Sequence, residues 1–105
     1  MTSEQHVADS LRATGWEILV RNWRGGGSEL DIVASREGVI RIVEVKARQD
    51  GDPLAAVTPA KCRRLTRAAR AFLSQWTGKY EEVAFAIALV DGQDLTWIDN
   101  AFDVS

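Results

Sequence analysis

Two segments with alternating side chains, joined at Glu37-Gly38, constrain the fold more than any other part of the chain. In residues 29–35 and 39–47, apolar and polar side chains alternate over much of the length, which is typical of neighbouring β-strands. A two-residue turn would pair Arg36 with Val39, so the numbers of paired residues would sum to 75. The sequence therefore predicts an antiparallel hairpin with a defined register.

This register gathers charged side chains at the open end of the hairpin. It places Asp31 directly opposite Glu44, and Glu29 opposite Lys46. Two carboxylates that face each other with Cβ atoms about 5 Å apart destabilise a sheet. The pair therefore predicts a cation between the two acids, and Mg²⁺ is a hard cation that binds carboxylates.

The remaining pattern predicts two helices and further strands. Thr58-Pro59 suits the start of a helix, with threonine as N-cap and proline in the first turn, and Gly78 suits its end. The apolar stretch at residues 82–90 is typical of a central strand covered on both faces. The other predicted elements are a helix at 3–14, strands at 16–23 and 95–98, and a loop at 48–57. The order αβββαββ predicts an α/β sandwich with a mixed central sheet flanked by helices.

Length and composition predict one cytoplasmic domain that covers residues 1–105. The chain has 105 residues, of which 46% are hydrophobic, and this is enough for one core. Its single cysteine, Cys62, fits a reducing compartment and falls on the apolar stripe of the second helix, where we expect it to be buried. The N-terminus lacks the pattern of a signal peptide, and no apolar run is long enough to span a bilayer. We therefore expect no membrane partner.

Charge is unevenly distributed along the chain. The net charge of −2 argues against a protein that coats nucleic acid without specificity. However, residues 54–80 contain six basic residues and no acid, whereas residues 81–105 contain only acids among their charged residues. A solvated helix face and a phosphate-binding face are equally good interpretations of this basic segment. The candidate nucleic-acid-binding residues are Arg24, Arg48, Lys61, Arg63, Arg64, Arg67 and Arg70.

The acids and the lysine of the hairpin together suggest phosphoryl chemistry. Asp31 and Glu44 would hold a divalent cation, with the backbone carbonyl of Val45 as a further ligand. Such a cation lowers the pKa of a bound water and withdraws charge from a phosphoryl oxygen. Lys46 would orient the water or stabilise charge that develops on phosphorus. The competing interpretation, an exposed hairpin end with ordinary solvated charges, is equally good on these residues alone.

A set of ordered segments gives the chain a specific resemblance. It closely resembles the YraN-like family of small bacterial predicted endonucleases, in the PD-(D/E)xK nuclease superfamily. This superfamily is restriction-endonuclease-like, with an αβββαβ(β) sandwich, and is related to archaeal Holliday-junction resolvases. The segments that carry the resemblance are Gly15-Trp16-Glu17-Ile18-Leu19-Val20-Arg21-Asn22, Glu29-Leu30-Asp31-Ile32-Val33-Ala34, Val43-Glu44-Val45-Lys46, Ala56-Val57-Thr58-Pro59 and Asn100-Ala101-Phe102.

The resemblance implies roles for single residues. Asp31 and Glu44 match the metal-binding acids, and Lys46 matches the catalytic lysine. Glu4 matches an acid that completes the metal and catalytic site in related proteins, and Glu29 matches a recurrent acid without an assigned role. Lys61 matches a basic residue near the start of the second helix. The chain departs from the family pattern at Ser3, where glycine is usual, at Ala47, where threonine is common, and at Cys62, where glutamine is common.

Two functions follow as expectations. The first is an endonuclease that depends on Mg²⁺ or Mn²⁺ and hydrolyses phosphodiester bonds in DNA, including branched or structured DNA. The second is a non-catalytic module that keeps the nuclease fold and binds nucleic acid or a protein partner. A monomer and a homodimer both stay open, and resolution of a four-way junction would call for a homodimer.

Overall fold

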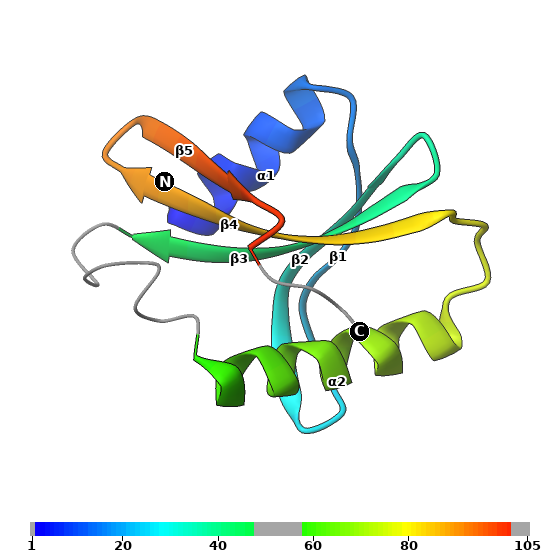
Figure 1. Ribbon diagram of the computed structural model, residues 1–105. Helices are drawn as coiled ribbons and strands as arrows, with labels where there is room; N and C mark the ends of the chain where they lie inside the picture. Colours follow the sequence, from blue (N-terminus) through cyan, green and yellow to red (C-terminus); the bar gives the residue numbers. More distant parts are fainter. Residues whose placement is uncertain (1, 48–57, 102–105) are drawn as a thin grey trace.

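A computed structural model describes residues 2–47 and 58–101, and its elements follow the predicted order (Figure 1). The α/β fold class and the αβββαββ order are confirmed, and the arrangement agrees with a restriction-endonuclease-like sandwich. The predicted loop at 48–57 lies outside the described residues. The elements are α1 (Ser3–Ala13), β1 (Glu17–Gly25), β2 (Ser28–Arg36), β3 (Val39–Ala47), α2 (Pro59–Gln75), β4 (Glu82–Asp91) and β5 (Asp94–Asp99).

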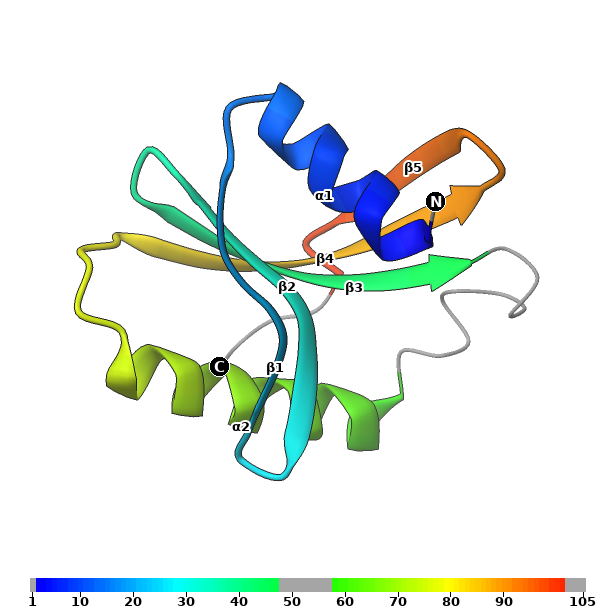
Figure 2. The same ribbon diagram turned by 180° about the vertical axis from the view of Figure 1, so that it is seen from behind.

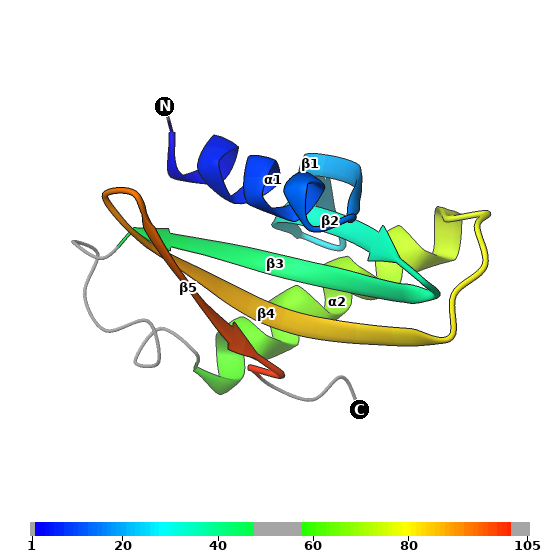
Figure 3. The same cartoon turned by 90° about the horizontal axis from the view of Figure 1, so that it is seen from above.

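The five strands form one mixed sheet that lies between the two helices. The spatial order is β1-β2-β3-β4-β5, and only the β3–β4 pair is parallel. Figure 3 shows α1 on one side of the sheet and α2 on the other. Each helix packs on its own apolar cluster, with Phe72 of α2 buried in one and Leu11 of α1 buried in the other. In the described part of the chain, no helix has the length and apolar character needed to cross a membrane.

The register of the β2–β3 hairpin is confirmed. Glu37 and Gly38 both adopt positive φ, at 49° and 82°, as a two-residue hairpin turn of the primed type requires. The paired residues run from Arg36–Val39 to Ile32–Val43, and every pair sums to 75. The ladder ends there, so the predicted oppositions of Asp31 with Glu44 and of Glu29 with Lys46 fall beyond its last pair.

The ladder ends because β2 leaves β3 and curls with β1 toward α2. Figure 2 shows this ribbon crossing α2 while β3 continues beside β4. Along the curled part, β2 still pairs with β1, and Leu30 contributes to the cluster under α2. At the ribbon tip, Gly26 has φ +61°, and a Cβ there would lie 2.8 Å from the carbonyl oxygen of Arg67 on α2. The tip of the ribbon therefore lies against the helix backbone, and β2 and β3 diverge.

Local signals explain where the helices begin and end. The Thr2 hydroxyl caps α1, and the Thr58 hydroxyl caps α2 by accepting the Lys61 N–H at 3.1 Å. The predicted end of the second helix at Gly78 is wrong, because α2 ends at Gln75 and the next residue, Trp76, is extended and stacks on Phe72. Cys62 is half-buried rather than buried, because it lies in the first turns of α2, before the buried residues Leu65 and Phe72.

On the α1 side of the sheet, Arg41 joins two aromatic rings. Its guanidinium lies 4.1 Å from the ring centre of Trp97 and 5.3 Å from that of Trp16, and it pairs with Asp99. We expect Arg41→Leu to lower the free energy of unfolding by about 1–3 kcal/mol, because it removes two cation–π contacts of a side chain that is only 15% exposed. Urea denaturation measures this loss.

Arg12→Leu is the matched control for Arg41→Leu. Its ion pair with Asp9 joins side chains that are 53% and 48% exposed, so we expect a loss below about 0.5 kcal/mol. Equal losses in the two variants would contradict a structural role for the Trp16–Arg41–Trp97 stack.

Candidate active site

Asp31 lies where β2 and β3 separate, and it is the centre of a group of acids. Its Oδ2 accepts the N–H of Val45 on β3 at 2.8 Å. Burial is the largest effect on the pKa of Asp31 and raises it; Glu44 raises it next, the Val45 hydrogen bond lowers it, and Glu4 and Glu29 add smaller increases. Together these effects raise the pKa of Asp31 to about 6. Four carboxylates from α1, β2 and β3 therefore share one electrostatic environment.

Two of the surrounding acids are held by basic side chains. Glu44 accepts the Lys61 ammonium at 2.7 Å, and their side chains are only 18% and 26% exposed. Glu29 pairs with Arg24 at 3.1 Å, although the Arg24 side chain is 80% exposed. The first contact ties β3 to the start of α2, and the second lies within the β1–β2 ribbon.

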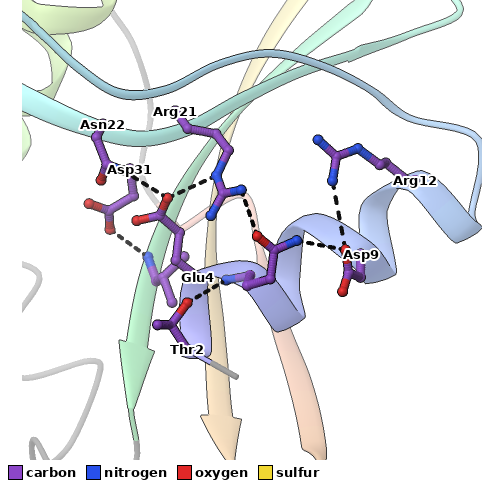
Figure 4. A network of polar contacts seen from close by, with 9 residues as sticks. Thr2, Glu4, Asp9, Arg12, Arg21, Asn22 and Asp31 are labelled. Atoms are coloured by element: carbon purple, nitrogen blue, oxygen red, sulfur yellow. Dashed lines mark hydrogen bonds and ion pairs between the residues drawn. The ribbon is translucent and has the colours of Figure 1, made fainter.

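The third acid, Glu4, is held by β1. Its Oε1 accepts Arg21 Nε at 3.0 Å and Asn22 Nδ2 at 3.0 Å. Figure 4 shows Glu4 reaching from α1 toward these two residues, with Asp31 beside them. Arg21 also donates to Gln5 at 2.9 Å. The start of α1 is therefore fastened to the sheet next to Asp31.

Asp31 differs from its neighbours because no basic side chain within residues 2–47 and 58–101 forms an ion pair with it. Its only polar contact in that part of the chain is the backbone N–H of Val45. Lys46 is half-buried and likewise forms no ion pair with the described residues. As far as the described residues go, the site thus combines one shielded carboxylate that has no basic partner with one lysine that has no acidic partner.

The donor set fits a divalent cation held by few protein ligands. Among the described residues, no three His, Cys, Asp or Glu side chains come together closely enough to hold an ion jointly, so Glu4 does not complete a three-acid cluster here. A Mg²⁺ site does not require three such side chains, because the ion is usually bound through one or two carboxylates and several waters. The N–H of Val45 faces Asp31, and in a strand the carbonyl of the same residue points to the same side. Asp31, Glu44 and this carbonyl fit such a cation.

The predicted basic residues do not form one cluster. Lys61 lies in the site itself, in contact with Glu44. Arg48 lies outside the described residues, and Arg24 projects from the ribbon. The others share the exposed face of α2 and are Arg63, Arg64, Arg67 and Arg70.

Reasoning from the sequence missed three contacts of the site. It gave no role to Arg21 and Asn22, although both lie on β1 at the level where it pairs with β2 near Asp31. Pairing the predicted strands at 16–23 and 29–35 would have placed them there. It also missed the Lys61–Glu44 pair, for which the sequence holds no local signal because the two residues are joined only through the tertiary fold.

Comparisons with known proteins agree with one another. The uncharacterised protein family UPF0102 matches residues 3–104. A UPF0102 protein of Trichlorobacter lovleyi is 40% identical, over 97% of this chain and 87% of that protein. A UPF0102 protein of Pseudomonas entomophila is 36% identical, over 96% of this chain and 89% of that protein. One from Helicobacter pylori is 33% identical over 71% of this chain, which spans 66% of that protein's length.

Proposed function

The chain belongs to the uncharacterised protein family UPF0102, and we propose that it is a divalent-metal-dependent endonuclease of the PD-(D/E)xK superfamily. The observation that carries the proposal is the isolation of Asp31. It is shielded, surrounded by three other acids and without a basic partner among the described residues. A structural acid in such surroundings would be expected to have a cation of its own. A divalent metal ion bound at Asp31 would supply this positive charge.

Each residue of the site has a role in this proposal. Asp31 and Glu44 hold Mg²⁺ or Mn²⁺, with the carbonyl of Val45 as a further ligand. The bound ion would acidify a water and draw charge from the phosphoryl group. Lys46 lies two residues beyond Glu44 on the same face of β3, and its ammonium orients the attacking water or stabilises the charge on phosphorus.

The two outer acids have different roles. Glu4 is held by Arg21 and Asn22, so it fixes the start of α1 and adds negative potential at Asp31. Both of these hydrogen bonds use Oε1, so Oε2 is the oxygen through which Glu4 would serve as a metal ligand. Glu29 adds to the same potential and is tied to Arg24.

DNA is the proposed substrate because of the basic face of α2. Exposed arginines at positions 63, 64, 67 and 70 follow Lys61 along the helix, and Lys61 reaches the site. Lys61 lies on the side of α2 that faces the sheet, so the exposed arginines form a separate basic surface. Such a surface suits a phosphate backbone, which these residues contact without reading its sequence. Branched or structured DNA is the proposed preference, and cleavage of a four-way junction would call for a homodimer.

A cleavage assay tests the proposal directly. The protein is incubated with single-stranded, duplex and four-way-junction DNA in Mn²⁺ or Mg²⁺, together with Lys46→Ala. We expect at least one substrate to be cut, and the variant to lose about 10²–10³-fold in rate, because it lacks the charge beside phosphorus. Lys79→Ala is the matched control, since it removes an equal charge beyond the far end of α2. Full activity of Lys46→Ala would refute the assigned role.

The second candidate is a non-catalytic module with a nuclease fold. Three contacts favour it: Lys61 occupies one oxygen of Glu44, and Arg21 and Asn22 both occupy one oxygen of Glu4. In this alternative, the acids only stabilise the fold. DNA binding by the wild type without cleavage of any of the three substrates, in either metal, would support the module and reject the nuclease.

A further inference from the structure

The site contains two lysines, and the one that contacts an acid is not the one in the Glu44-Val45-Lys46 sequence. Lys61 comes from the first turn of α2, and its ammonium lies 2.7 Å from Oε1 of Glu44. Lys46 has no such contact with the described residues. The cap at Thr58 fixes the backbone of Lys61, because the hydroxyl accepts its N–H at 3.1 Å. The ammonium therefore reaches Glu44 from a helix end that is itself held in place.

This ammonium lies on a carboxylate that the proposed function assigns to a divalent cation. Both side chains are mostly shielded from water, at 26% and 18% exposed, so solvent screens the pair only in part. A doubly charged ion on the same carboxylate would repel the ammonium strongly at this distance. Lysine has a flexible four-carbon stem and can turn its charge elsewhere, whereas Glu44 is fixed on a central strand.

Resting on the proposed function, we infer that Lys61 is an exchangeable counter-ion of Glu44. In the metal-free protein its ammonium neutralises the carboxylate and keeps the acids of the site from repelling one another. When a divalent cation binds, Lys61 leaves Glu44 and turns toward the substrate phosphate at the site. Lys61 is thus a positioning residue that links metal occupancy to the binding of the DNA backbone.

Metal binding without DNA tests this directly. Mn²⁺ affinity is measured by calorimetry and electron paramagnetic resonance for the wild type, Lys61→Met, Lys61→Arg and Lys79→Met at constant ionic strength. We expect Lys61→Met to bind Mn²⁺ about five- to tenfold more tightly, because the competing ammonium is gone. Lys61→Arg restores a cation and should remain within about twofold of the wild type. Lys79→Met, an equal charge removed far from the site, should change affinity less than about twofold.

A measurement on the unaltered protein avoids any effect of substitution on folding. The ¹⁵N signal of the Lys61 ammonium, assigned by its absence in Lys61→Arg, should shift and exchange faster with water when Mg²⁺ is added. An unmoved signal in the presence of saturating Mg²⁺ would overturn the inference. So would Mn²⁺ affinity in Lys61→Met that is equal to or weaker than that of the wild type. If the wild type and Lys61→Met both fail to bind Mn²⁺, the inference and the proposed metal-dependent function fall together.

Discussion

Asp31→Asn is expected to slow DNA cleavage strongly and, at the same time, to make the metal-free protein more stable at neutral pH. The rate should fall by at least about 10²-fold, because the amide is a poor ligand for a hard cation. The asparagine oxygen still accepts the N–H of Val45, so the local structure should persist. The gain in stability comes from removing a charge that lies in a shielded position near three other acids.

The pH dependence of this gain has a definite sign. Asp31 has a pKa of about 6 in the folded chain, against an ordinary value of 3.8. The folded state therefore binds more protons than the unfolded state between these values, and stability falls as the pH rises through this interval. At pH 7.5 we expect Asp31→Asn to be more stable by about 1–2 kcal/mol, after allowance for its partial exposure, or by roughly 5 °C in melting temperature. Near pH 3.5 the gain should vanish.

Thermal melts in chelator at several pH values measure this effect. Glu81→Gln removes a carboxylate from an exposed position beside the β2–β3 turn and serves as the control, with no expected gain. If Asp31→Asn is less stable than the wild type at pH 7.5, the acid is a structural residue. A stabilised variant that still cleaves DNA would instead show that the Asp31 carboxylate destabilises the fold but is not needed for cleavage.

Phe72→Ala is expected to have the largest effect on stability. The ring is fully buried on α2, meets Trp23 of β1 edge-on at 5.5 Å and stacks on Trp76 at 5.8 Å between ring centres. It therefore joins the curled ribbon to the helix. Truncation of such a side chain costs about 3–5 kcal/mol, a large part of the stability of a small domain. Urea denaturation should show a much lower midpoint, or an unfolded chain at 37 °C.

Tyr80→Ala is the control for Phe72→Ala, because Tyr80 is 41% exposed. We expect it to cost less than about 1 kcal/mol. If Phe72→Ala costs no more than this, the helix does not hold the ribbon through its aromatic ring. Phe72→Leu keeps most of the volume and should recover much of the loss.

The fold is predictable from the sequence wherever short-range chemistry decides the structure. The register of β2 and β3 depends on two neighbouring residues, Glu37 and Gly38, that take up positive φ together. The starts of the helices depend on threonine caps. The end of α2 is not predictable in this way, because the aromatic contact of Trp76 with Phe72, and not the glycine further on, accompanies its last turn.

The candidate site is predictable only in outline. Alternation along the strands brings Asp31 and Glu44 to the same end of the hairpin, and their electrostatic interaction agrees with this. The divergence of the strands there is not predictable, because side-chain alternation contains no information on how far a ribbon curls. The partners of the acids also come from distant parts of the chain: Lys61 is 17 residues from Glu44, and Arg21 is 17 residues from Glu4.

The contact of Gly26 with the backbone of α2 has a consequence for the spacing of the site. Asp31 is carried by the ribbon, Glu44 by the parallel pair of strands and Lys61 by the helix. The ribbon and the helix meet at the ribbon tip, where the absence of a side chain on Gly26 lets backbone lie against backbone. The separation of Asp31 on the ribbon from Lys61 on the helix thus depends on an uncharged residue outside the site. A larger residue there would lift the ribbon and alter the metal-binding geometry, with every acid and lysine still in the chain.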